Sequence, residues 1–203
     1  MTQRGRNLLV LSAIVGIFIA FALAGRFLVD PDDMGRVNNG TLIVPHIPIG
    51  ELNLRTPEGE AWTADDMAGQ WSLIYVGGEA CDKACKNALF YLMTRLRRSL
   101  AQESDRVRLM LVHTRPPSEE LKTFMRERLA SMVELHGDPK TVTRALEPAF
   151  EAASADPRHH LFLAAPDGQI FMWYPSHEDR EALLEEADGL YQDLTRTLKG
   201  ARI

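Results

Sequence analysis

"WSLIYVGGEACDKACKNALFYL", residues 71–92, contains an apolar run, a glycine pair and an amphipathic segment in direct succession. Residues 71–76 have the length and composition of a strand that is buried on both faces of a parallel sheet. Gly77 and Gly78 end this run. Large apolar residues then recur at helical spacing (Leu89, Leu92, Met93, Leu96, Leu100). We therefore predict a buried strand, a turn, and a helix that begins near Asp82.

The chain continues with further strand and helix signals. Residues 107–112 (VRLMLV) form a second buried strand signal, and Ser118 followed by two glutamates begins a helix that reaches about residue 130. Residues 132–137 (MVELHG) form a weaker strand signal. Asp138 and Pro139 then begin a helix expected to extend toward residue 153.

The C-terminal part differs in pattern. Two apolar runs (HLFLAA and IFMWY) flank a tight-turn sequence at residues 165–168, which predicts an antiparallel hairpin. A final helix is expected from about residue 178 to residue 198. Parallel βαβ units followed by a hairpin and a closing helix describe a three-layer α/β sandwich. We place this domain at residues 51–203, after a linker at residues 29–50 that is rich in Pro, Gly, Asn and Asp.

The N-terminal segment has a different character. Residues 8–25 carry no charge, and a run of about 18 apolar residues can cross a bilayer core. We predict a transmembrane helix at residues 8–28. Arg4 and Arg6 precede it and acidic residues follow it, so residues 1–7 are expected in the cytoplasm and the domain in the periplasm, with the helix in the inner membrane. A signal peptide cleaved after Ala24 is the alternative, and it also exports the domain.

Composition limits the classes of partner. A chain of 203 residues, 45% hydrophobic and 25% charged, suits one globular domain with a short attachment. Its formal net charge of −5 argues against nucleic-acid binding, which needs a basic surface. The expected partners are proteins and, through the N-terminal helix, the lipid bilayer.

Cys81 and Cys85 are the only cysteines in the chain. In an oxidising compartment they can form a structural disulfide. Their spacing places both sulfurs on one side of a helix, and a helix N-terminus lowers the pKa of a nearby thiol. Thiolates suit copper(I), and the same low pKa suits thiol–disulfide exchange. These three uses of the pair stay open at this point.

Three segments together resemble the Sco/SenC family: WSLIYVGGEACDKACKNALF, DRVRLMLVHTRPPSEEL and HHLFLAAPDGQIFMWYP. Members of this family are membrane-anchored, thioredoxin-like copper proteins that help assemble cytochrome c oxidase. The resemblance implies a thioredoxin-like fold, with Cys81 and Cys85 as copper ligands or as a redox pair. It also implies a histidine ahead of the hairpin as a third ligand to one copper ion, and a partner oxidase subunit with a copper site.

Three histidines are candidates for the third ligand. His159 and His160 begin a strand that should arrive at the sheet edge bearing the cysteines. Neighbouring residues of a strand point to opposite faces, so at most one of the two is expected to face the pair. His113 ends the second central strand at the same edge, and it is a further candidate as ligand or as a partner of a ligand.

Three functions follow from these residues. The first is a copper-binding factor for oxidase assembly that uses Cys81, Cys85 and His159 or His160. The second is a thiol–disulfide oxidoreductase in which Cys81, nearer the helix start, attacks the target and Cys85 completes the redox pair. The third is a scaffold in which the cysteines form a passive bridge and no cofactor binds.

Overall fold

The structure of the chain is a computed structural model, and it describes residues 15–17, 38–129, 131–150 and 156–200. Its contacts divide the chain into two units, residues 1–37 and 38–203. Within the first unit, residues 15–17 are helical and exposed. The rest of the predicted transmembrane helix at residues 8–28, the cytoplasmic tail and Ala24 lie outside the described residues. Among the residues described, no helix combines the length and apolar character that a membrane span requires.

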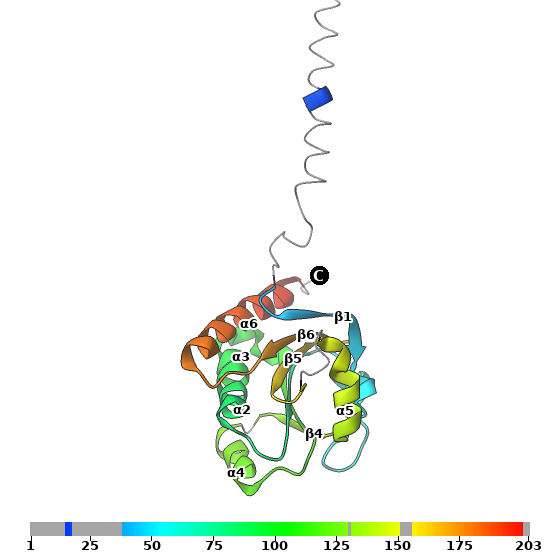
Figure 1. Ribbon diagram of the computed structural model, residues 1–203, viewed down its shortest axis with the longest axis vertical. Coiled ribbons are helices and arrows are strands. Elements are labelled where there is room, and N and C mark those ends of the chain that lie inside the picture. The colour runs from blue at the N-terminus through cyan, green and yellow to red at the C-terminus, as the bar shows by residue number, and fades with distance from the viewer. Residues whose placement is uncertain (1–14, 18–37, 130, 151–155, 201–203) are drawn as a thin grey trace, which may run out of the picture. The chain divides into compact units, whose positions relative to one another are not determined.

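The second unit is built on one six-stranded sheet in the order β1-β6-β5-β2-β3-β4 (Figure 1). The strands are β1 (Thr41–Pro48), β2 (Trp71–Gly77), β3 (Val107–His113), β4 (Val133–His136), β5 (His160–Ala164) and β6 (Gln169–Pro175). β2, β3 and β4 run parallel, whereas β5 pairs antiparallel with both β2 and β6, and β1 pairs antiparallel with β6. The predicted parallel units and the C-terminal hairpin are confirmed.

Helices cover both faces of the sheet. The α-helices are α2 (Lys83–Asn87), α3 (Leu96–Ser99), α4 (Glu119–Arg128), α5 (Pro139–Leu146) and α6 (Arg180–Gly200). α2 and α3 are joined by a π-helical segment, η3 (Ala88–Arg95). The short 3₁₀ segments are η1 (Ile49–Leu52), η2 (Asp65–Met67), η4 (Ala101–Arg106) and η5 (Glu147–Ala149).

The core is divided by the sheet into two clusters. The first, here called the cysteine-side core, contains both cysteines and buried residues of η3, α4 and α6. The second, the α5-side core, contains buried residues of α5 and β1. Along β2 the side chains alternate between them, with Tyr75 on the cysteine side and Ile74 on the α5 side. This arrangement is the predicted three-layer α/β sandwich, with a thioredoxin-like mixed sheet in the middle layer.

Local sequence determines where the helices begin and end. The Asp82 carboxylate accepts a hydrogen bond from the Cys85 N–H at 2.9 Å and caps α2, and Ser118 and Asp138 cap α4 and α5 in the same way. α5 ends at Leu146, earlier than the predicted residue 153. Pro148 explains the early end, because it lacks the N–H that an α-helix needs and is accommodated instead in η5.

The predicted linker at residues 29–50 is wrong in its second half. Residues 41–48 form β1, whose Ile43 and Ile47 side chains are buried in the α5-side core. Pro45, which lies between these two buried residues in a segment where the register shifts, is exposed, so the alternation typical of a strand is interrupted. The folded unit therefore begins near residue 38 rather than at residue 51.

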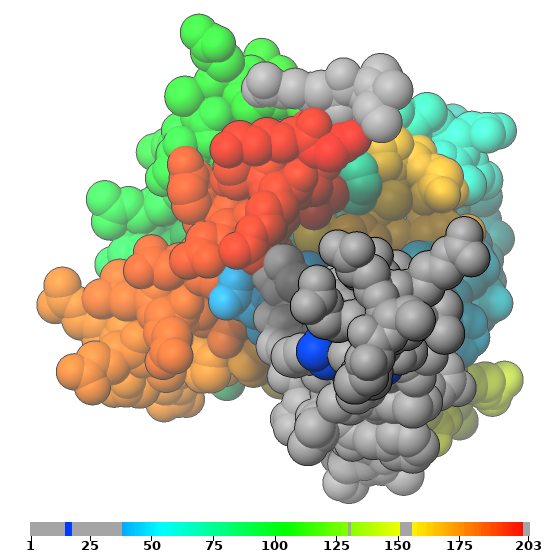
Figure 2. Space-filling model, turned by 90° about the horizontal axis from the view of Figure 1, so that it is seen from above, coloured from blue at the N-terminus to red at the C-terminus, as the bar shows by residue number. Residues whose placement is uncertain are grey.

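The first residues of this unit are hydrogen-bonded to α6 through Asp193. The Asp193 carboxylate accepts hydrogen bonds from the backbone N–H groups of Asn39 and Gly40 at 2.7 and 2.9 Å. It also accepts from the Asn39 side-chain amide and from the Tyr174 hydroxyl, each at 3.1 Å. Figure 2 shows the light-blue beginning of the unit beside the orange and red helix α6. A buried charge is stable here because four donors replace its hydration.

Candidate functional site

The two cysteines lie at the carboxyl end of β2, in the loop and first turn that lead into α2. They form a disulfide with 5.2 Å between their Cα atoms. The Cys81 side of the bridge is 8% exposed and the Cys85 residue is 2% exposed. The predicted pairing of these residues in space is therefore observed. Disulfide sulfurs are not thiolates, so metal binding by the pair requires reduction to two thiols first.

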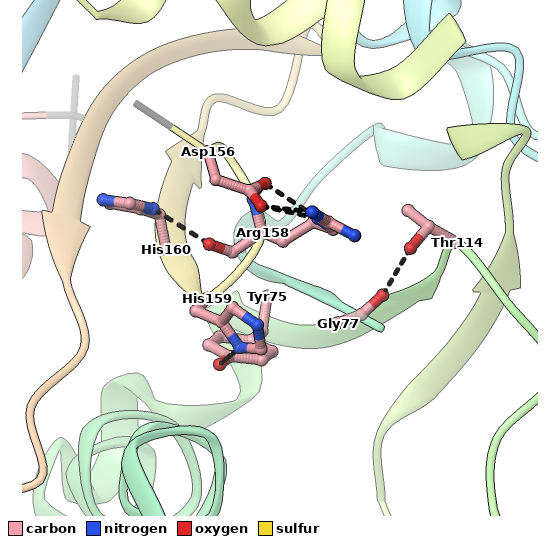
Figure 3. A network of polar contacts seen from close by, with 7 residues as sticks. All are labelled: Tyr75, Gly77, Thr114, Asp156, Arg158, His159 and His160. Atoms are coloured by element: carbon pink, nitrogen blue, oxygen red, sulfur yellow. Dashed lines mark hydrogen bonds and ion pairs between the residues drawn. The ribbon is translucent and has the colours of Figure 1, made fainter. Parts of the chain in front are cut away.

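The loop before Cys81 is held against the β3–α4 connection. The carbonyl of Gly77 accepts hydrogen bonds from the backbone N–H of Thr114 at 3.1 Å and from its hydroxyl at 2.8 Å (Figure 3). The carbonyl of Glu79 accepts from the N–H of Ser118 at 3.0 Å. These contacts fix the exit of the loop from the sheet, so the position of Cys81 is tied to the neighbouring parallel unit.

His159 lies on the cysteine side of the sheet. Its backbone N–H donates to the carbonyl of Val76 at 2.8 Å, which places it beside the last residues of β2. Its Nδ1 atom is 3.3 Å from the hydroxyl of Tyr75 (Figure 3), a member of the cysteine-side core. Burial raises the pKa of the Tyr75 hydroxyl, and the Ser176 hydroxyl donates a hydrogen bond to the carbonyl oxygen of His159. The structure thus brings His159 to the end of β2 from which the cysteine loop leaves.

His160 lies on the opposite side of the sheet. Its ring packs against Phe150 and Trp173 at centroid distances of 4.9 and 5.0 Å, and both of these residues contact the α5-side core. Its Nδ1 atom is 3.2 Å from the carbonyl of Arg158, and burial lowers its pKa. The structure does not bring His160 to the cysteine pair, because successive side chains at the start of β5 point to opposite faces.

His113 is buried at the end of β3 and is 1% exposed. Its Nε2 atom lies 3.4 Å from a carboxylate oxygen of Glu134, and its ring stacks on His136 at 5.4 Å. Burial lowers its pKa, and the Glu134 charge opposes this effect. In register His113 pairs with Gly77, yet the contacts of its side chain connect it to β4 rather than to the cysteines.

The donor types available at the pair fit copper once the disulfide is opened. Two thiolates are soft ligands for copper(I), and the imidazole of His159 extends the set to copper(II). In the oxidised form, the described part of the chain contains no group of three His, Cys, Asp or Glu side chains arranged to hold a metal ion.

Two grooves border the helix that carries Cys85. One, of about 670 Å³, lies between η3 and α4 and is lined by Phe90, Tyr91 and Phe124 among others, with the Lys86–Glu120 ion pair of 2.6 Å at its border. The other, of about 830 Å³, lies between η3 and α6 and includes the exposed side chains of Leu184 and Tyr191. They provide concave surfaces beside α2 and η3.

Sequence reasoning missed two residues of this site, Tyr75 and Ser176. Tyr75 was assigned only to a buried strand. A buried tyrosine hydroxyl needs a hydrogen-bond partner, and this requirement is the signal that could have identified it. Ser176 follows the second strand of the hairpin and has no pattern that distinguishes it in the sequence.

The sequence of the chain matches a known protein family. Residues 71–199 match the family model described as "Transmembrane-like, thioredoxin-like, C-terminal domain". The chain belongs to this family. No curated protein matches the chain.

Solved structures with similar folds include Sco proteins. Yeast Sco1 with copper bound is 17% identical, with 83% of this chain and 97% of that chain covered and a TM-score of 0.53. BsSco, described as a Sco-family cytochrome c oxidase assembly protein with a disulfide switch, is 16% identical over 82% and 98% of the two chains, with a TM-score of 0.50. The thioredoxin domain of a thiol-disulfide oxidoreductase from Bacteroides vulgatus is 16% identical over 78% and 97%, also with a TM-score of 0.50. The predicted likeness to Sco proteins is thus confirmed for the fold.

Proposed function

We propose that this protein is a Sco-like factor that binds one copper ion through Cys81, Cys85 and His159 and transfers it to a copper site of a cytochrome c oxidase subunit during assembly. The resemblance of the cysteine segment to the Sco family and the fold shared with copper-bound yeast Sco1 support this proposal. The proposed location is the inner membrane, with residues 8–28 as the anchor and the domain in the periplasm. The uncharged run between arginines and acidic residues supports that location.

The observation that carries the proposal is the position of His159. It is hydrogen-bonded to Val76 and Tyr75, at the end of β2 and on the side of the sheet that holds both cysteines. Two sulfurs and one imidazole are therefore available at one edge of the sheet, on elements that are fixed by backbone hydrogen bonds.

Copper uptake requires a preceding reduction. The Cys81–Cys85 disulfide accepts two electrons and two protons from a dithiol reductant and becomes two thiols, while the reductant becomes a disulfide. Both thiols then lose their protons when they bind the copper ion, which in this function is cargo. His159 would contribute a ring nitrogen of its imidazole as the third ligand.

The test is a copper(I) titration of the reduced full chain in the presence of a competing chelator. The wild type is expected to bind one copper ion, and Cys81→Ser, Cys85→Ser and His159→Ala are expected to weaken binding by more than about 100-fold, beyond the effect of an outer-shell change. His160→Ala is the matched control and should bind like the wild type, because its ring lies on the other face of the sheet. Failure of the wild type to bind copper at micromolar concentration, or loss of binding in the His160 variant instead of the His159 variant, contradicts the proposal.

A thiol–disulfide oxidoreductase is the second candidate, and the disulfide at a helix N-terminus favours it. In the reduced protein the Cys81 thiolate would attack a target disulfide and form a mixed disulfide. Cys85 would then displace the target thiol and restore the intramolecular bridge. The greater exposure of Cys81 suits the attacking role. A reduction potential below about −300 mV, typical of structural bridges, would exclude this activity.

A further inference from the structure

The groove between η3 and α6 gathers most of the exposed apolar side chains of the folded unit. Among the described residues of this unit, the large apolar side chains that are exposed are Leu42, Val44, Tyr91, Leu184 and Tyr191. The last three line the groove, which has a volume of about 830 Å³, whereas the first two lie on β1. Exposed apolar side chains that gather in one concave place mark a binding surface, while single scattered ones do not.

A straight row of side chains forms one wall of the groove. Residues 83, 87, 91, 95 and 99 line it at intervals of four along α2, η3 and α3. Four residues are slightly more than one turn of an α-helix and slightly less than one turn of the wider π-helix, so the two drifts offset each other. The row is roughly 20–25 Å long, which matches about four turns of a helix. α6 forms the opposite wall (Figure 1).

The two walls of the groove differ in charge. The row carries Lys83 and Arg95 and no carboxylate. The α6 side carries two acidic residues and one basic residue: Glu178, Asp188 and Arg180. Within the described ranges of the chain, neither Arg95 nor Asp188 forms an ion pair. An occupant with acidic groups toward the row and a basic group toward Asp188 is therefore complementary to the groove in charge.

We infer that this groove docks an amphipathic helix of a partner protein, whose apolar stripe has acidic residues on one flank and basic residues on the other. Both walls are built mainly by helices, whose backbone groups are hydrogen-bonded internally. The groove therefore offers side chains and no free strand edge. A helix suits such a groove because its apolar side chains recur on one face at spacings of three and four residues.

The groove also lies next to the cysteine pair. Lys83, at one end of the row, stands between Cys81 and Cys85 in the sequence, at the start of α2. One end of the docked helix would therefore lie beside the first turn of α2, which contains Cys85. The assignment of this helix to the subunit that receives copper rests on the proposed function, whereas the docking itself does not.

The test uses a fluorescein-labelled peptide of about 18 residues, long enough to form a helix on binding. Its leucines form one stripe, with glutamates along one flank and the same number of lysines along the other. A control peptide of the same composition has its leucines spread around the helix. Fluorescence anisotropy follows binding to the oxidised full chain in nanodiscs of zwitterionic lipid, with empty nanodiscs as the blank. Only the amphipathic peptide is expected to bind.

Two pairs of variants locate the binding. Leu184→Glu is expected to weaken it at least about tenfold, because a charge would face the apolar stripe. Leu42→Glu is its matched control, since the two leucines are 52% and 51% exposed and Leu42 lies on β1. Arg95→Glu replaces an attraction by a repulsion and is expected to weaken binding about fivefold. Arg98→Glu, at an exposed arginine outside the groove, should not change binding, because the peptide has no net charge.

Equal losses in a groove variant and its control, or equal binding of the two peptides, overturn the inference. Absence of binding at about 100 μM of the amphipathic peptide does so as well. Sedimentation of the full chain in detergent micelles tests a second copy as the occupant. A dimer that Leu184→Glu dissociates and Leu42→Glu does not would assign the groove to that copy and overturn the partner helix.

The outcome for the groove is separate from the outcome for copper. If the wild type binds no copper, the proposed function fails while the peptide measurement still tests the groove. If the wild type binds copper and the amphipathic peptide does not bind, the docking is refuted while the proposed function stands.

Discussion

Replacement of Asp193 by asparagine is expected to destabilise the folded unit by about 4.5–6 kcal/mol. Asp193 is 2% exposed, and one of its carboxylate oxygens accepts from Asn39 N–H, Gly40 N–H and the Tyr174 hydroxyl at 2.7, 2.9 and 3.1 Å. The other oxygen accepts from the Asn39 side chain at 3.1 Å. The substitution keeps the shape of the side chain and removes its charge.

The magnitude follows from these four contacts. Asparagine can present its oxygen to the first three donors, and each of these bonds weakens by about 1 kcal/mol, since bonds to a charged acceptor contribute about 1.5–3 kcal/mol and neutral ones about 0.5–1.5 kcal/mol. The new amide nitrogen then faces the amide nitrogen of Asn39, so two donors oppose each other and the fourth bond is lost.

The measurement is urea unfolding of the full chain followed by circular dichroism. The midpoint is expected to fall while the dependence on urea concentration stays unchanged, which indicates a loss of stability without a change in the surface exposed on unfolding. Asp188→Asn is the matched control, because Asp188 is an exposed acid on the same helix and should change stability by less than about 0.5 kcal/mol. A loss below about 1 kcal/mol for the Asp193 variant would refute the reasoning.

Three further predictions concern stability. Reduction of the Cys81–Cys85 bridge, or replacement of both residues by serine, should lower the free energy of unfolding by no more than about 2 kcal/mol and leave the domain folded. The effect is small because a bridge with a sequence separation of 4 closes a very short loop. Unfolding on reduction would contradict this prediction. Burial lowers the pKa values of His113 and His160. Below about pH 6.5 the unfolded chain therefore binds protons at these histidines that the folded chain does not bind. The free energy of unfolding should fall with decreasing pH by up to about 1.4 kcal/mol per pH unit for each histidine. The slope, measured by urea unfolding between about pH 7.5 and 5.5, should flatten in His113→Gln, and an unchanged slope would count against a neutral buried ring. Gly189→Ala should destabilise the domain by about 1–2 kcal/mol in the same assay despite its gain in helix propensity, since the new Cβ would lie 2.8 Å from the Cβ atom of Asn39; a stabilised variant would show that this contact relaxes.

Most of the fold could be predicted because its central elements have strong local signals. The apolar runs at β2 and β3 and the helical spacing from Leu89 to Leu100 depend only on which residues are buried, and all of these helical positions are buried. β1 could not be found in this way. It is an edge strand with two prolines and an irregular register, and its composition is that of a linker.

The candidate site could be predicted only in part. Strand alternation indicated that His159 and His160 cannot both face the cysteines, but the choice between them depends on the left-handed backbone at His159, which is set by tertiary hydrogen bonds. His113 was predicted at the end of the second central strand, and the structure places it there, but its burial was not predicted. Its burial arises from packing beside β4, and this contact has no signature in the local sequence.

β2 is paired with β3 along its whole length and with β5 from Ser72 to Tyr75. Opening or closing the cysteine bridge therefore takes place next to a strand that is hydrogen-bonded to a neighbouring strand on both sides. A partner that distinguishes the dithiol from the disulfide has to sense a difference confined to the residues between Gly78 and the first turn of α2. A partner protein would then recognise the redox state of the cysteines from the local surface around them and not from a change in the shape of the domain.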